Sequence, residues 1–207
     1  FFKKFKNHQF CCSSHMLWVG DRTRYLNSEH LDFVSKLDNP IGIKIGPKIK
    51  IDDIPAICSK VNPQNEQGKL IFIVRLGEKN IEKMLPKIIE KVKYYGHEII
   101  WFCDPMHGNT IKSQNGYKTR QFKTIINELE SFFNIHMSSN TIPGGVHIEL
   151  TGENVTECLG GINDIKDKDL DLRYETACDP RLNNLQSLEL IFKLTDLINK
   201  KEYQCQN

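Results

Sequence analysis

Short apolar runs recur along the chain, and each is followed by polar residues and then by a longer amphipathic stretch. The runs are rich in Ile, Val and aromatic residues, as buried parallel strands are. They predict six strands, at 16–20, 41–46, 70–77, 98–103, 145–150 and 174–178. The intervening stretches predict helices near 28–37, 52–60, 80–95, 118–137 and 186–200. This alternation indicates βαβ units and a parallel α/β sheet, either doubly wound or closed into a barrel.

Cationic side chains accompany three consecutive predicted strands. Arg22 comes just after the first strand, Lys44 lies between two isoleucines of the second, and Arg75 stands in phase with Ile71 and Ile73 of the third. Taken singly, a snorkelling lysine or a structural ion pair explains each cation. Because the carboxyl ends of parallel strands converge on one rim, the three together indicate a site for a doubly charged anion, such as a phosphate or a carboxylate.

A second group of polar residues follows the later strands. His107, Glu149 and Asp179 each lie at or just past the end of a predicted strand. A capping or core histidine, a helix cap or an ion pair is the simpler explanation for any one of them. As a set, an imidazole and two carboxylates make a site for a divalent metal, and Mn, Fe, Co and Zn are all compatible. A zinc knuckle built on Cys103 and His107 is an alternative with only two ligands.

Composition narrows the classes of partner. The 207 residues include 39% hydrophobic and 26% charged residues and carry a net charge of +2, which gives no long-range field toward nucleic acid or an anionic membrane. No apolar run approaches the roughly 20 residues that cross a bilayer. Seven cysteines without a short-spaced framework predict reduced thiols. We expect a cytoplasmic protein with no nucleic-acid or membrane partner, able to form a homo-oligomer.

Five segments of the chain carry a family pattern in unbroken order. They are WVGDRTR (18–24), NPIGIKIGP (39–47), WFCDPMHGNT (101–110), PGGVHIELTGENVTECLGG (143–161) and RYETACDPRLN (173–183). Together they resemble the class II (plant-like) 3-deoxy-D-arabino-heptulosonate 7-phosphate (DAHP) synthases. The resemblance implies a (β/α)8 TIM barrel. It also implies a metal-dependent transferase, with Mn as the first expectation, that condenses phosphoenolpyruvate with erythrose 4-phosphate in the first step of the shikimate pathway of aromatic amino acid biosynthesis.

The resemblance assigns roles to individual residues. The family's metal ligands correspond to His107, Glu149 and Asp179. Its phosphoenolpyruvate site corresponds to Trp18, Asp21, Arg22, Lys44 and Arg75. Lys44 is the expected proton donor to the developing alkoxide, because it can serve the substrate and the reacting oxygen together. The family usually has Glu where this chain has Asp21, and the shorter side chain predicts a lost or water-bridged contact.

Two features of the family do not occur in this chain. They are a cysteine that serves as fourth metal ligand on the first barrel strand, and a KPRS-type region that contacts substrate. We therefore expect one partial barrel domain over residues 1–207, comprising strands 3–8, with the first two strands and any plastid address upstream of Phe1. Two alternatives stay open: a non-catalytic truncated barrel, and a related condensing enzyme with another sugar acceptor.

Overall fold

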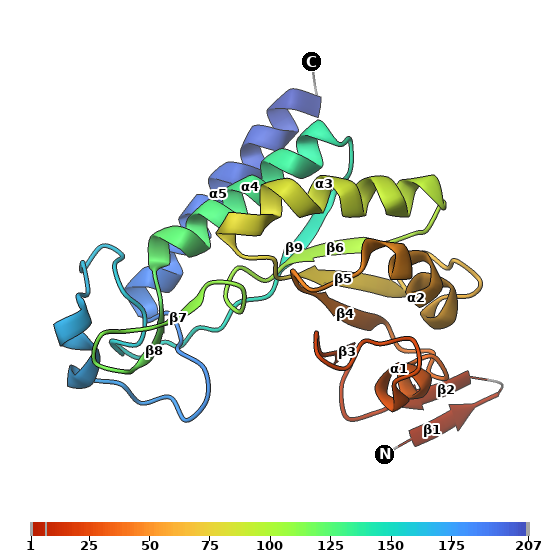
Figure 1. The fold of residues 1–207 in the computed structure, drawn as a ribbon, viewed down its shortest axis with the longest axis horizontal. Helices are drawn as coiled ribbons and strands as arrows, with labels where there is room; N and C mark the ends of the chain where they lie inside the picture. Colours follow the sequence, from red (N-terminus) through yellow and green to blue (C-terminus); the bar gives the residue numbers. More distant parts are fainter. Residues whose placement is uncertain (1, 7, 206–207) are drawn as a thin grey trace.

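The structure, a computed structural model, describes residues 2–6 and 8–205 and is built around a five-stranded parallel sheet (Figure 1). The strand order β3-β4-β5-β6-β9 follows the chain, so every carboxyl end lies at the same edge. These strands are β3 (Leu17–Val19), β4 (Ile41–Ile45), β5 (Leu70–Val74), β6 (Ile100–Cys103) and β9 (Pro143–Val146). Two antiparallel hairpins lie outside this sheet: β1 (Phe2–Phe5) with β2 (His8–Cys11), and β7 (Thr110–Lys112) with β8 (Lys118–Arg120).

Helices connect the strands and pack along the sheet. They are α1 (Glu29–Val34), α2 (Ile54–Val61), α3 (Glu78–Tyr94), α4 (Phe122–Ser138) and α5 (Asn184–Cys205), with short 3-10 turns η1 (Ile51–Asp53) and η2 (Asp167–Leu172). In Figure 1, α3, α4 and α5 form one neighbouring group, in which α4 contacts both of the others. Within the part of the chain that the structure describes, no helix is both long enough and apolar enough to cross a membrane.

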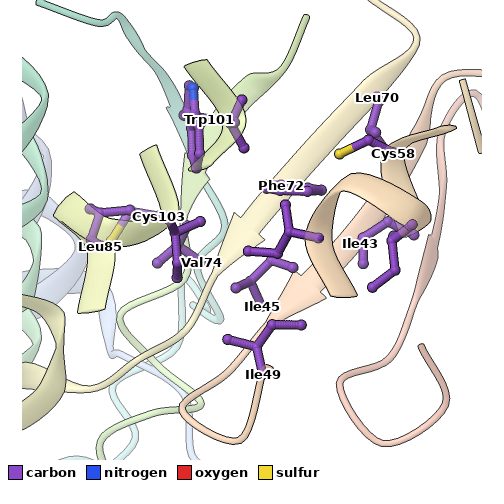
Figure 2. Packing of buried hydrophobic residues seen from close by; sticks show 14 of the residues in the cluster. Ile43, Ile45, Ile49, Cys58, Leu70, Phe72, Val74, Leu85, Trp101 and Cys103 are labelled. Carbon is purple, nitrogen blue, oxygen red and sulfur yellow. The ribbon is translucent and has the colours of Figure 1, made fainter. Parts of the chain in front are cut away.

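The hydrophobic core lies between the helices and one face of the sheet. Figure 2 shows Ile43, Ile45, Phe72 and Val74 packed in this layer with Leu85 of α3. Side chains alternate between the two faces of a strand, so the residues between these core positions point away from the helices. The strand-end cations can therefore gather on the other face without entering the core.

The α/β class and the parallel sheet are confirmed, but the predicted barrel is not. The described residues form an open five-stranded sheet and no closed barrel. The predicted strand at 174–178 is wrong, because residues there are irregular. The backbone N–H of Glu175 donates to the carboxylate of Glu157 at 3.2 Å, a side-chain acceptor in place of a neighbouring strand. The nearest strand-like pairing is an isolated parallel bridge that joins Leu182, just after this segment, to Leu150.

Several element boundaries also differ from the prediction. The helix expected from residue 118 begins at Phe122, because residues 118–120 pair with β7 instead. The strand expected at 145–150 is β9, which ends at Val146. Both hairpins were absent from the prediction. These differences matter for function because Arg120, at the end of β8, and Glu149, beyond β9, both lie beside the cavity described below.

Candidate active site

A cavity of about 550 Å³ opens at the carboxyl edge of the sheet. Its walls come from the segments that follow the parallel strands and from the β7–β8 hairpin. Seven of the eight expected site residues line it: Trp18, Asp21, Arg22, Lys44, Arg75, His107 and Asp179. The eighth, Glu149, lies beside it, with its Oε1 3.2 Å from His107 Nε2. The structure thus brings together residues that lie up to 161 positions apart in the sequence.

Asp21 organises one wall of the cavity. Its carboxylate accepts from Arg75 Nη1 at 3.0 Å, from Arg24 Nε at 3.0 Å and from the backbone N–H of Gly46 at 2.8 Å. A Cβ at Gly46 would lie 2.5 Å from Asp21 Oδ2, so this close approach requires glycine. Arg75 also donates through Nη2 to the backbone oxygen of His107 at 2.7 Å. Asp21 therefore makes direct contacts despite its short side chain, and it aligns Arg75.

Two residues at the same wall remain accessible to a ligand. Arg22 is exposed and forms no ion pair with any other residue in the described ranges 2–6 and 8–205. Trp18 is half-exposed, and its ring meets His147 edge-on at a centroid distance of 5.4 Å. An anion in the cavity would thus meet one cation whose charge is not already neutralised by a carboxylate.

Asp104 connects the anion side of the cavity to the histidine. It is fully buried, and its Oδ2 is 2.5 Å from Lys44 Nζ and 2.8 Å from His107 Nδ1. Burial by itself raises the pKa of Asp104, but the hydrogen bond from His107 and the charge of Lys44 outweigh it and hold this pKa well below its ordinary value. Burial lowers the pKa of Lys44, with Asp104 opposing the change. Lys44 is thus a buried cation held by one ionised carboxylate.

His107, Glu149 and Asp179 form the candidate metal centre. Each offers a ligand atom, and these atoms lie within 4.8 Å of one another. Asp104 binds Nδ1 of His107 and so leaves Nε2 facing the two carboxylates. Burial raises the pKa of Glu149, but the hydrogen bond with His107 and the charge of Arg120 more than offset this and lower it.

The remaining titratable groups of this centre complete its electrostatics. Burial likewise opposes ionisation of Asp179, yet the ion pair with Lys118 lowers its pKa overall. The hydrogen bond to Asp104, then that to Glu149, raises the pKa of His107 to about 9. Two ionised carboxylates and one oriented imidazole are a donor set that fits a divalent metal, provided that His107 releases the proton it holds at neutral pH when the metal binds.

Cys103 does not belong to this donor set. Its side chain is fully buried in the core beside the helices, and burial raises the pKa of its thiol well above the usual value. His107, by contrast, lines the cavity. The structure therefore gives no support to a zinc knuckle at this pair.

Four charged residues near the site were not found by sequence reasoning: Lys118, Arg120, Glu128 and Glu157. Arg120 and Lys118 lay within an expected helix, where a charged residue is unremarkable. Glu128 lies on α4 among apolar positions, and a charged residue on the apolar side of a helix was the sequence signal that could have identified it. Asp104 is a fifth such residue, since its position directly after a buried strand was visible in the sequence but indicated no partner.

Comparison with known proteins provides the decisive observation. Residues 2–195 match the class-II DAHP synthetase family. The chain belongs to this family. It is 51% identical to the phospho-2-dehydro-3-deoxyheptonate aldolase AroG of Mycolicibacterium smegmatis over 186 residues. This aligned region covers 90% of this chain and 40% of that protein.

A second relative gives the same picture. The phospho-2-dehydro-3-deoxyheptonate aldolase of Streptomyces coelicolor is 48% identical over 185 residues, 89% of this chain and 41% of that protein. The family resemblance that the motifs indicated is therefore confirmed. The chain spans about 40% of the length of these curated relatives.

Proposed function

We propose that this chain forms the catalytic edge of an enzyme that condenses phosphoenolpyruvate with erythrose 4-phosphate, yielding DAHP and phosphate. This is the first step of the shikimate pathway. The observation that carries the proposal is the placement of three cations and a His–Glu–Asp donor set around one cavity. Membership of the class-II DAHP synthetase family, and the names of the two relatives, support the same reaction.

In this proposal, phosphoenolpyruvate binds to the side of the cavity lined by Arg22, Lys44 and Arg75, which we call the cationic wall. Arg22 and Arg75 offer planar guanidinium groups, which match the geometry of phosphate and carboxylate oxygens, and Lys44 adds a third positive charge. Asp21 holds Arg75 through the 3.0 Å contact, so little side-chain freedom is lost when the anion binds. Trp18 forms an apolar boundary beside these cations.

The second half of the proposed site would hold a divalent metal. His107, Glu149 and Asp179 are its protein ligands, and Mn is the first candidate, with Co, Fe and Zn also compatible. When bound, such a metal supplies Lewis acidity to a carbonyl oxygen. Asp104 contributes by fixing the ring of His107 through Nδ1.

The proposed reaction joins C3 of phosphoenolpyruvate to the aldehyde carbon of erythrose 4-phosphate. Water then adds at C2, and phosphate leaves with cleavage of its C–O bond. Lys44 transfers a proton to the oxygen that was the aldehyde carbonyl. Burial lowers the pKa of Lys44, which makes this proton easier to release than that of an exposed lysine.

Phosphate release from phosphoenolpyruvate by the full-length protein tests the proposal. We expect release only with erythrose 4-phosphate and Mn²⁺ both present, and loss of release when a chelator is added. A comparable rate with another aldose phosphate, but not with erythrose 4-phosphate, would assign a different acceptor. A folded protein that binds Mn²⁺ and phosphoenolpyruvate without turnover would instead support a non-catalytic role.

A further inference from the structure

Arg120 is a fully buried cation next to the candidate metal centre. Its Nη1 lies 2.7 Å from Glu149 Oε2 and also donates to the backbone oxygen of Pro180. Its Nε donates to Thr110 Oγ1 at 3.2 Å. Its Nη2 lies 3.7 Å from Asp179 Oδ1 and has no hydrogen-bond partner among the described residues. One guanidinium group thus faces both carboxylates of the donor set.

Both carboxylates belong to segments outside the regular helices and strands. Glu149 lies beyond the end of β9, and Asp179 lies in the irregular stretch after η2. The bridge between Leu150 and Leu182 joins the two segments at residues that flank the ligands. Arg120 reaches one segment through a side chain and the other through the carbonyl of Pro180, which directly follows Asp179.

We infer that Arg120 is a positioning residue that sets the spacing of the Glu149 and Asp179 carboxylates for metal binding. The inference rests on the proposed metal site. A guanidinium presents its donors in a rigid planar fork, whereas a lysine ammonium is a single point charge on a flexible stem. The observed contacts use two nitrogens of the fork, Nη1 for Glu149 and the Pro180 carbonyl and Nε for Thr110, whereas a lysine would place all of its donors on one atom.

Lys118 provides an internal comparison. It also pairs with Asp179, but its side chain is 49% exposed, whereas that of Arg120 is fully buried. A solvated lysine that makes a single ion pair fixes little geometry. Substitution of Lys118 removes a positive charge next to Asp179 but leaves the contacts of Arg120 with both ligand-bearing segments in place. The two cations therefore predict opposite effects on metal affinity.

The experiment measures the Mn²⁺ dissociation constant of the full-length protein from the electron paramagnetic resonance signal of free Mn²⁺. We expect Arg120→Lys and Arg120→Met to weaken binding by about 10–100-fold, as loss of outer contacts to metal ligands typically does. Lys118→Met should bind Mn²⁺ as tightly as the wild type or more tightly. Lys193→Met removes a partly exposed cation that pairs with Glu130, away from the segments that carry Glu149 and Asp179, and serves as the control for a generic loss of charge.

Several results would overturn the inference. Wild-type affinity in Arg120→Lys would show that charge matters and the fork does not, and tighter binding in both Arg120 variants would show that Arg120 only repels the metal. Circular dichroism establishes which variants are folded. If the Arg120 variants do not fold, Thr110→Val removes the hydroxyl that accepts from Nε; it should give a weaker affinity than the wild type, and an unchanged one would contradict the inference.

The same titration separates this inference from the proposed function. If the wild-type protein does not bind Mn²⁺, or if His107→Gln binds it as tightly as the wild type, the proposed metal site itself is wrong. If binding depends on His107 while the Arg120 variants match the wild type, only the positioning role of Arg120 fails. The rise in melting temperature on addition of Mn²⁺ should follow the same order, because a ligand stabilises the folded state by an amount that grows with the logarithm of its affinity.

Discussion

Asp104 connects the two halves of the candidate site through one buried carboxylate. It binds Lys44, the proposed proton donor, and His107, the proposed metal ligand, and it accepts from the backbone N–H groups of Met106 and His107 at 3.1 and 3.2 Å. Its pKa lies well below the ordinary value because His107 and Lys44 outweigh the effect of burial. An ionised acceptor at this position fixes both side chains at once.

Substitution of Asp104 by Asn tests this connection. The amide has nearly the same size but carries no charge, and its NH₂ group cannot accept from either partner. We expect Asp104→Asn to weaken Mn²⁺ binding by about 10–100-fold and to lower kcat as well. Asp52→Asn breaks an exposed ion pair with Lys91 and is the matched control. Mn²⁺ affinity and kcat at the wild-type level in Asp104→Asn would contradict the proposed role.

Lys44 carries a separate prediction, which concerns chemistry and not only binding. If Lys44 transfers a proton in the reaction, Lys44→Ala should lower kcat by about 10²–10⁴-fold even at saturating phosphoenolpyruvate. Steady-state kinetics in both substrates measures this directly. An unchanged kcat with a raised KM for phosphoenolpyruvate would restrict Lys44 to binding. Lys91→Ala, which removes a lysine paired with Asp52 at the surface, should leave both constants unchanged.

The sequence singled out candidate site residues at or just past predicted strand ends, and the structure places them around one cavity, while their roles stay a prediction. Lys44 and His107 are examples, since a charged residue at the end of a buried strand is conspicuous in the sequence. The roles of Asp104 and Arg120 depend on partners that are distant in the chain: Lys44 is 60 positions from Asp104, and Pro180 is 60 positions from Arg120. Pairing over such distances requires the fold, so periodicity alone could not reveal it.

At the scale of elements, Glu128 ties helix α4 to the loops beneath the site. It is fully buried; one oxygen accepts from the backbone N–H of Gly77 at 2.8 Å and the other from Asn109 Nδ2 at 2.7 Å. Gly108 packs so closely on this loop that a Cβ there would lie 2.4 Å from Gly77 N. The Glu128 carboxylate thus joins the loop after β5 to the turn that carries His107.

Glu128 predicts a pH dependence of stability. Burial, with the Asp104 charge adding to it, raises the pKa of Glu128 to about 8, although its hydrogen bonds to Gly77 and Asn109 favour the ionised form. In the unfolded chain a glutamate titrates near 4.3, so between these values the folded state keeps a proton that the unfolded state releases. The contribution of protonated Glu128 to the free energy of unfolding is therefore complete below about pH 4 and is lost as pH rises through about 8. Over this range the free energy of unfolding falls by at most about 1.4 kcal/mol per pH unit.

Urea unfolding at several pH values measures this contribution. Glu128→Gln cannot titrate, so its free energy of unfolding should rise relative to that of the wild type between pH 5 and pH 8. Glu130→Gln makes the same change on the same helix at a partly exposed pair with Lys193, and it should not alter the pH profile. Parallel pH profiles for Glu128→Gln and the wild type would contradict the assignment.

The elements themselves were predicted unevenly, for physical reasons. The five helices were located because an amphipathic repeat is a local signal. The central strands were found because residues buried on both faces form apolar runs. The β7–β8 hairpin lacks such a run, since its residues include Lys112, Lys118 and Arg120. The failure at 174–178 has a different cause, because the Glu157 carboxylate takes up the backbone donors of Glu175 and Arg181.

At the scale of the whole molecule, the open sheet separates stability from chemistry. The helices and the apolar core occupy one face of the sheet, and the polar cavity lies at the carboxyl edge of the strands. Parallel α/β proteins commonly place their active sites at this edge, because loops there can vary without disturbing the core. The proposed function places catalysis at this edge, and the family relationship and the residues around the cavity support that proposal.

In the proposed site, His107, Glu149 and Asp179 hold a divalent metal beside the cationic wall. Anomalous X-ray diffraction from crystals of the full-length protein grown with Mn²⁺ and phosphoenolpyruvate tests this arrangement. We expect an anomalous peak in contact with all three side chains, and phosphoenolpyruvate against Arg22, Lys44 and Arg75. A peak bound by other residues, or phosphoenolpyruvate bound away from these cations in crystals of an active protein, would contradict it.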